Sequence, residues 1–210
     1  MTVSVVNGYT TVADLARYMT VDSTTYNDDL ATAINTASRQ IDGYCGRIFY
    51  AATAQGVHQN KYYYSADLTT LLINDCINIV EVALSTGANQ TYDNIVPSTG
   101  YVEEPLNGYA DGLNGWPVTR LRFTNDYMLP TQWQQYPNVR IHGRWGWLAT
   151  PEPVRQSCLI MAAEIFKLRE APFGVAGFAD YGAVRVGKMS PQAVALLSPY
   201  RNMNSVAGMA

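Results

Sequence analysis

The sequence predicts an α+β protein, in which a small helical bundle from the N- and C-terminal parts carries an inserted β-rich domain. Near both ends of the chain, apolar residues recur every three or four positions. Between these regions, short β-branched and aromatic runs are separated by Gly, Asn, Asp and Pro. With 48% apolar residues and 15% charged residues, the 210-residue chain can bury a sizeable core. We expect a helical part over 1–50, the β-rich insertion over 51–149, core-completing helices over 150–200 and a flexible tail over 201–210.

Two helices are expected before residue 50. The first follows threonines at 10–11, either of which can cap it, and continues to about Met19. The second begins with Asp28 and Asp29, whose charges favour a helix start, and ends near Gly46. Its apolar stripe consists of Leu30, Ile34, Ala37, Ile41 and Tyr44.

The middle of the chain is expected to consist mostly of strands. Six short runs have strand character, at 58–65, 70–75, 77–85, 90–96, 118–124 and 138–147. The segment 103–117, EEPLNGYADGLNGWP, is polar and contains several glycines, so it predicts a long loop.

Helices are expected again after residue 150. Pro151 and Pro153 suit the beginning of a helix, where a missing N–H costs nothing, and its wide apolar face predicts burial on more than one side. Glycines punctuate 174–187, which predicts a loop or short hairpin. Ser190 is a candidate cap for a short last helix that Pro199 ends or bends.

The distribution of charge argues against a general nucleic-acid-binding surface. The formal net charge is −3; residues 1–153 hold 8 Lys/Arg and 14 Asp/Glu, whereas residues 154–210 hold 6 and 3. The basic C-terminal part suits docking on an acidic partner, and a solvated face explains it equally well. Three scattered cysteines indicate reduced, buried thiols, and neither a signal peptide nor a membrane span is expected.

No catalytic, cofactor-binding or metal-binding set can be assembled from the sequence. Neither His58 nor His142 has a second ligand at metal-binding spacing, and Cys158 lies on the apolar stripe of a helix. The carboxylate pairs at 28–29 and 103–104 are adjacent, so their side chains diverge and make poor acid–base partners. We therefore expect a protein that is not an enzyme and needs no cofactor.

Three ordered motifs lie in the two terminal parts of the chain. The first begins TTVADLARYM and ends in an Ile-Asp-x-Tyr-Cys-Gly-Arg-x-Phe-Tyr element at 41–50. The second is the strand VRIHGRWGW followed by the helical PEPVRQSCLIMAAEIFKLREAPFGV. The third is the ending SPQAVALLSPYRNM. Together the motifs cover roughly the first 50 and the last 70 residues. In this order they resemble the motifs of the head–tail connector (adaptor) proteins of tailed bacteriophages, in the longer type with a β-rich insertion.

The resemblance implies a structural protein of the virion neck, present in the host cytoplasm during assembly. Such proteins form a ring, commonly of twelve copies, below the portal protein. The ring extends the DNA channel and joins the portal to a head-closure (stopper) or tail protein. The implied partners are therefore the portal, the next neck protein, other copies and genomic dsDNA that passes without specific binding, with no membrane involved.

The resemblance and the charge pattern suggest two groups of assembly residues. The first is expected to dock on the portal and consists of Arg185, Lys188, Leu196, Leu197, Tyr200 and Arg201. We expect the segment 174–210 to be mobile alone and to order on the portal, so that deleting 190–210 leaves the fold intact and abolishes portal binding. The second group, at the subunit interface or the junction between core and insertion, consists of Arg47, Arg144, Trp145 and Trp147. The two tryptophans could pack in the core or at a subunit boundary.

Two other functions remain open. One is a head-closure or tail-completion protein of the same neck, a class that is mostly β-structured. The other is a soluble carbohydrate- or host-recognition module with an aromatic platform at Tyr62, Tyr63, Tyr64 and Trp133. For a ring, we expect the acidic segment 51–137 near the channel, where carboxylates let DNA slide.

Overall fold

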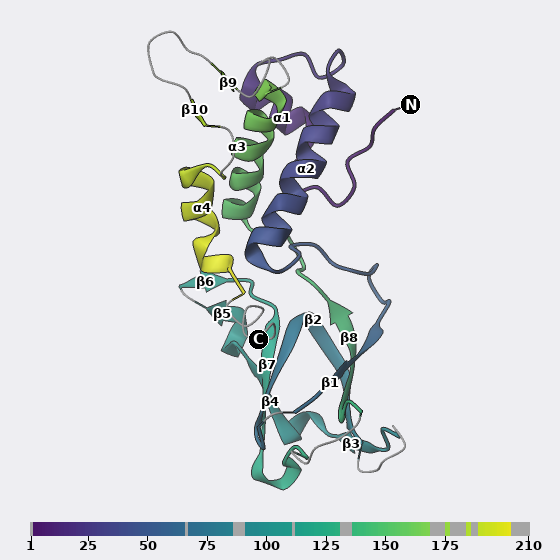
Figure 1. Cartoon of the computed structure of the whole chain (residues 1–210). Coiled ribbons are helices and arrows are strands. Elements are labelled where there is room, and N and C mark those ends of the chain that lie inside the picture. Colours follow the sequence, from purple (N-terminus) through teal and green to yellow (C-terminus); the bar gives the residue numbers. More distant parts are fainter. Residues whose placement is uncertain are drawn as a thin grey trace. The chain divides into compact units, whose positions relative to one another are not determined.

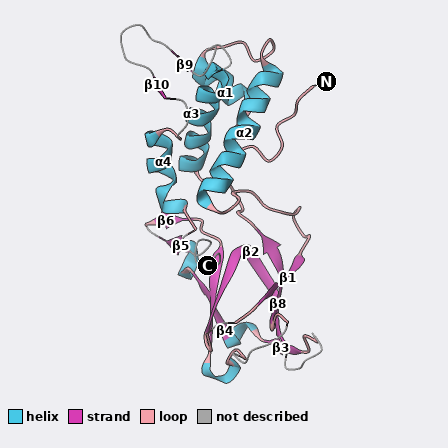
Figure 2. Cartoon of the chain, viewed as in Figure 1, coloured by secondary structure: helices cyan, strands magenta, loops and turns pink. Residues whose placement is uncertain are grey.

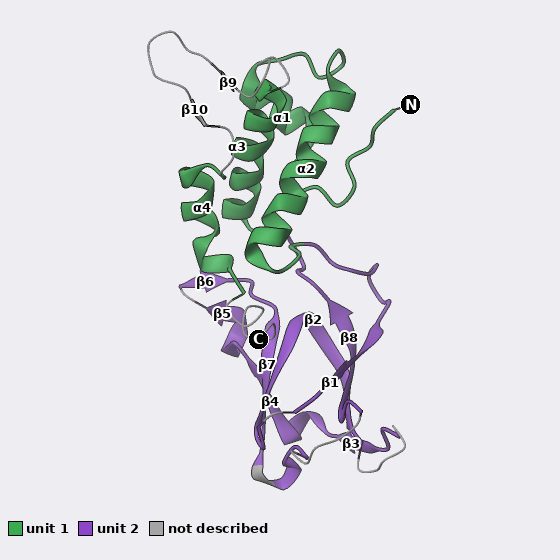
Figure 3. Cartoon of the chain, in the orientation of Figure 1, with its two compact units in different colours: residues 1–49, 150–210 green, residues 50–149 purple. Residues whose placement is uncertain are grey.

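The computed structural model describes residues 2–65, 67–85, 91–110, 112–130, 136–168, 175–176, 184–185 and 189–202. The chain divides into two compact units (Figure 3), a helical unit of Met1–Phe49 with Thr150–Ala210 and a β-rich unit of Tyr50–Ala149. Helices come from both ends of the chain and strands from its middle (Figures 1 and 2). The α+β fold with an inserted β-rich region is therefore confirmed.

The two N-terminal helices have the expected bounds. Helix α1 spans Val12–Met19, and the Thr11 side chain caps it by accepting a hydrogen bond from the Asp14 N–H. Helix α2 spans Asn27–Cys45 and ends at Gly46, whose φ of 65° lies in the left-handed region that favours glycine.

The C-terminal helices complete the core of the helical unit. Helix α3 spans Glu152–Leu168 and packs against α1, α2 and α4. Its wide apolar face is buried as predicted. Helix α4 spans Pro191–Leu197 and is followed by a 3₁₀ turn, η5, at Ser198–Tyr200, so the regular helix ends before Pro199. Ser190 occupies the N-cap position, although its side chain makes no capping hydrogen bond there.

Residues 2–10 form an N-terminal strap that precedes α1 and is bound to α2 by hydrogen bonds. The Asn35 side chain accepts from the Val6 N–H at 2.9 Å and donates to the Ser4 carbonyl at 2.9 Å. The Tyr9 hydroxyl donates to Asp42 and accepts from the Phe49 N–H at 3.0 Å. Asp42 and Phe49 lie near the two ends of the Ile-Asp-x-Tyr-Cys-Gly-Arg-x-Phe-Tyr element, so the Tyr9 hydroxyl fastens the strap to both ends of the motif.

The β-rich unit is built on one antiparallel sheet with the strand order β1-β8-β2-β7-β4, and β3 pairs with β2 beside this path. These strands are β1 (Gln59–Tyr63), β2 (Thr70–Leu84), β3 (Asn94–Val96), β4 (Tyr101–Glu104), β7 (Val118–Phe123) and β8 (Val139–Trp145). A small hairpin joins β5 (Tyr109–Ala110) to β6 (Leu113–Asn114), and in the helical unit β9 (Val175–Ala176) pairs with β10 (Val184–Arg185). Short 3₁₀ turns lie at Ser98–Gly100, Leu106–Gly108 and Asn125–Tyr127.

Two strand predictions require correction. The runs at 70–75 and 77–85 belong to one strand, β2, which continues through Cys76 and absorbs the irregularity as register shifts against β7 and β8. The predicted loop at 103–117 begins within strand β4 and includes the β5–β6 hairpin. Because Glu104 of β4 pairs with arginines of β7, the polar sequence suits an exposed strand as well as it suits a loop.

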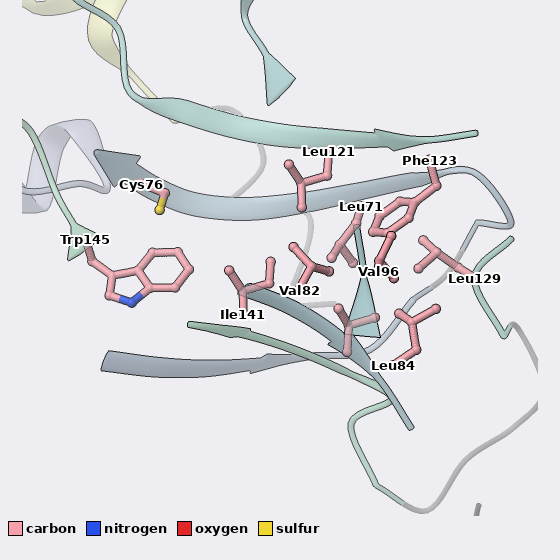
Figure 4. Packing of buried hydrophobic residues seen from close by; sticks show 11 residues of the cluster. Leu71, Cys76, Val82, Leu84, Val96, Leu121, Phe123, Leu129, Ile141 and Trp145 are labelled. Carbon is pink, nitrogen blue, oxygen red and sulfur yellow. The ribbon is translucent and has the colours of Figure 1, made fainter. Parts of the chain in front are cut away.

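The core of the β-rich unit is a cluster of buried hydrophobic residues, most of them from the strands of the main sheet. Figure 4 shows Leu121, Val82 and Ile141 pointing into the same space, with Trp145 toward one end and Leu129 toward the other. The remaining cluster residues are Leu71, Cys76, Leu84, Val96, Phe123 and Val139. Alternate residues of β8 are buried, as expected of a strand with one face on a core.

Candidate assembly surfaces

The two histidines and three cysteines of the chain are its candidates for metal binding or nucleophilic chemistry. In the part of the chain that the structure describes, no group of three His, Cys, Asp or Glu residues is arranged to hold a metal ion. The His58 and His142 rings lie 5.6 Å apart, and the Nδ1 atom of His142 is 2.8 Å from the Asn60 side-chain oxygen. The two histidines are far apart in the sequence, so their spacing did not indicate this pair. Pairing of β1 with β8 brings the two segments together.

The three cysteines are buried and free, as expected. Burial raises the pKa of the Cys45 thiol and that of the Cys76 thiol to about 12. Burial also raises the pKa of Cys158, whose sulfur lies 3.5 Å from the Ser38 hydroxyl oxygen. Because the thiolate is the reactive form, these residues are poor nucleophiles. Among the described residues, no helix is long and apolar enough to span a membrane.

Trp145 and Trp147 are both buried within the β-rich unit, where they are 1% and 2% exposed. The Trp145 ring nitrogen donates to the Gln59 carbonyl at 2.9 Å. The Trp147 ring nitrogen donates to the buried carboxylate of Asp75 at 2.8 Å. Both rings therefore contribute to packing inside this unit, and a direct role at a subunit boundary stays a prediction.

The backbone around the two tryptophans clips together the first and last segments of the β-rich unit. The Ala52 N–H donates to the Trp145 carbonyl at 2.9 Å, and the Trp147 N–H donates to the Tyr50 carbonyl at 3.2 Å. Between them, Gly146 has a φ of 98°, and a Cβ atom there would collide with the Tyr50 carbonyl oxygen. The distinctive WGW sequence thus closes the insertion where the chain enters and leaves it.

Arg47 and Arg144, the other two predicted junction residues, lie in different units and are partly exposed. The Arg47 guanidinium is near Cys45, where its charge opposes the effect of burial on the pKa of that thiol. The Arg144 Nε donates to the Thr53 carbonyl at 3.4 Å, beside the same closing clip. Whether either residue contacts a neighbouring subunit stays a prediction.

The predicted portal-docking residues divide into buried and exposed sets. Leu197 is 0% exposed and Tyr200 is 3% exposed, with the Tyr200 ring 5.7 Å from that of Phe49. Leu196 is partly exposed, and Arg201 is exposed with its guanidinium 5.1 Å from the centre of the Tyr44 ring. Leu196 and Arg201 therefore remain available for docking, whereas Leu197 and Tyr200 fill the core.

This packing corrects the expectation that deleting 190–210 leaves the fold intact. The deletion would remove Leu197, Tyr200 and Ala193, which is 0% exposed, from the core of the helical unit. The sequence suggested a mobile segment because its glycines and small residues outnumber the three buried residues that anchor it. Arg185 belongs to β10, opposite Val175 of β9. Lys188 and the tail beyond Asn202 lie outside the described residues.

The tyrosines proposed as an aromatic platform point to opposite faces of the strand and its extension. Tyr62 and Tyr64 are 51% and 62% exposed, whereas the Tyr63 ring lies 6.2 Å from that of Trp145. Tyr62 contacts Tyr92 with a tilt of 51° between the rings. Trp133 lies outside the described residues. A flat platform of three adjacent rings is therefore not formed by these tyrosines.

Comparison with known proteins shows a likeness to solved structures. No family model matches the chain, and no curated protein matches it. A chain from the solved neck of an empty GTA particle shares the fold, with a TM-score of 0.56 and 15% identity over 95% of this chain and 93% of that chain. A chain from the virion of a native gene transfer agent particle gives a TM-score of 0.43 and 18% identity, over 83% and 77% of the two chains. At these identities, the first likeness shows a common fold.

Proposed function

We propose that this protein is a structural component of a phage-like neck, and specifically a head-to-tail adaptor. Copies of the chain form a ring, of twelve in the proposal, below the portal. The ring continues the DNA channel and offers its far side to a head-closure or tail protein. The observation that carries the proposal is the likeness to a neck chain, which covers nearly the whole length of both chains.

The described motifs support the same proposal, because each has a clear structural task. The Ile-Asp-x-Tyr-Cys-Gly-Arg element ends α2 and holds the strap through Asp42. The WGW strand closes the β-rich unit, and the LLSPYR ending packs Leu197 and Tyr200 into the helical core. Motifs with these tasks preserve a scaffold rather than an active site, which suits a structural protein.

The helical unit favours an adaptor over a head-closure or tail-completion protein. Those proteins are mostly β-structured, whereas here four α-helices of the described chain form one of two units. The recognition-module alternative loses support, since Tyr63 turns toward Trp145 and away from Tyr62 and Tyr64.

Passage of DNA is compatible with the charge of the β-rich unit. Residues 50–149 hold five Lys/Arg and eight Asp/Glu. A surface with an excess of carboxylates does not gather phosphates, so DNA can move past it without the salt-dependent affinity of a basic surface. We propose that this unit contributes carboxylates to the channel.

Portal binding is the direct test of this function. The purified chain is mixed with portal rings from the same particle, and mass photometry measures added mass per portal. We expect a saturable complex that Leu196→Asp and Arg201→Glu weaken, because both side chains are accessible on the C-terminal segment. Gln192→Ala, also on exposed α4 surface, is the matched control. A folded wild-type chain that adds no mass at any concentration would refute the adaptor role.

A further inference from the structure

Strands β1 and β4 lie at the two ends of the main sheet order. Within the described residues, the outer edge of each is not paired with another strand. In the order β1-β8-β2-β7-β4, every neighbouring pair is antiparallel. Strands β1 and β4 therefore run in the same direction at the two ends of this path. Exposed edges present backbone N–H and C=O groups that can pair with another chain, so proteins control them with charge.

In each edge strand, a charged residue stands opposite a buried residue of the neighbouring strand, and Glu103 is itself exposed at the edge. In β1, the Lys61 ammonium lies 4.5 Å from the centre of the buried Trp145 ring. In β4, Glu103 stands opposite buried Leu121 in the register with β7, while its neighbour Val102 stands opposite exposed Arg122. Because side chains alternate along a strand, Lys61 and Glu103 occupy the same face of the sheet at its two edges.

These two residues form no ion pair within the described chain. Glu104, next in sequence, accepts Arg120 at 3.3 Å and Arg122 at 2.9 Å, but neither arginine bonds to Glu103. Desolvation lowers the pKa of Lys61 and raises that of Glu103, so the charged form of each is disfavoured in the single chain. A countercharge beside either residue would relieve this cost.

We propose that strand β4 of one copy pairs with strand β1 of the next copy, so that Glu103 lies beside Lys61 of its neighbour. The inference rests on the proposed ring and identifies one contact within it. Pairing of β1 with β1 would place Lys61 against Lys61, and pairing of β4 with β4 would oppose two copies of Glu103. Like charges directly opposite one another are destabilising, so the charges select the contact between unlike edges.

Contact between unlike edges has the symmetry that a ring requires. Each copy presents β4 on one side and β1 on the other, which is a heterologous contact that closes into a ring when the rotation between copies allows. Strands β1 and β4 run in the same direction within each copy. When the sheets of adjacent copies continue one another with the same face on the same side, β4 of one copy and β1 of the next are parallel. On the opposite face, Tyr62 and Val102, 51% and 43% exposed, would come to the same boundary.

Charge reversal tests this contact. The variants Lys61→Glu, Glu103→Lys and the double variant are prepared with Asp126→Lys, an exposed control in the same unit with the same change of charge as Glu103→Lys. Assembly on portal rings is followed by mass photometry, and circular dichroism verifies folding. We expect each single reversal to raise the concentration needed for half-assembly by about tenfold, which corresponds to about 1.4 kcal/mol. The double variant and the control should assemble as the wild type does.

The outcomes separate this contact from the proposed function. If both single variants assemble like the wild type, or if the double variant stays as weak as the singles although folded, the β4–β1 contact is wrong and the adaptor role stands. If the folded wild type binds no portal and forms no oligomer, both the adaptor role and the contact are overturned.

Discussion

Leu196 and Leu197 are neighbours in α4 that the structure assigns to different tasks. Leu197 is 0% exposed, whereas Leu196 is partly exposed on the same short helix. Leu197→Ala should leave a cavity and lower the free energy of unfolding by about 2–5 kcal/mol. Leu196→Ala should cost well under half as much, because its side chain already contacts water.

Two spectroscopic probes report on the two units separately. All four tryptophans lie within 50–149, so tryptophan fluorescence follows the β-rich unit. Circular dichroism at 222 nm follows the helices of the other unit. With a urea dependence of about 2 kcal/mol per molar for a unit of this size, the Leu197→Ala loss corresponds to a midpoint about 1–2.5 M lower in the dichroism transition.

The adjacent leucine provides the control for this experiment. Leu196→Ala should leave the dichroism midpoint within about 0.5 M of wild type and reduce portal binding instead. A Leu197→Ala chain with an unchanged dichroism midpoint would refute the packing of α4 in the core. That result would support the expectation that the segment 174–210 is mobile alone and orders only on the portal.

Four further predictions concern other parts of the chain. Gly146→Ala should lower the fluorescence-monitored stability by at least about 2 kcal/mol, because its φ of 98° and the Tyr50 carbonyl leave no room for Cβ; an unchanged midpoint would contradict the closing clip. Gly43→Ala, where a Cβ meets nothing within 4 Å, should stabilise α2 by about 0.5–1 kcal/mol in dichroism melts, and destabilisation would be the opposite result. The three buried thiols should react with a chromogenic disulfide reagent at pH 8 only after urea is added, so rapid labelling of the native chain would show that they are accessible. Desolvation raises the pKa of Glu103 in the folded state, so its ionised carboxylate destabilises the fold once the pH exceeds the ordinary pKa of a glutamate. Glu103→Gln should therefore be more stable than the wild type at pH 7 and as stable as the wild type below a pH of about 4. A stability difference that does not change with pH would rule this out.

Helix positions were predictable because periodicity and end signals agreed. The threonine cap, the Asp28–Asp29 start and the Gly46 stop each act through local backbone chemistry, so a single sequence shows them. The same holds for the proline start of α3 and for the burial of its wide apolar face.

Long-range pairing was not predictable to the same degree. The sequence divided β2 in two, since register shifts around Cys76 disturb the alternation that identifies a strand. The polar residues of β4 predicted a loop from the sequence. In the strand, Glu104 is favourable because it pairs with Arg120 and Arg122 of β7, which are distant in the sequence. Contacts of this kind become visible only when the register of the sheet is known.

The candidate docking residues show the same division. Periodicity predicted a short last helix, but not that Leu197 and Tyr200 would fill the core while Leu196 faces outward. A seven-residue helix makes barely two turns, so its apolar positions do not identify a single buried face. The aromatic contact of Tyr200 with Phe49 joins the two ends of the chain.

Cryo-electron microscopy of this protein bound to the portal ring of its own particle tests the central claim most directly. We expect a closed collar of copies below the portal, continuing the channel, with the β4 edge of each copy beside the β1 edge of the next. A well-folded protein that leaves the portal bare, or that binds it as scattered single copies without a ring, would contradict the adaptor role.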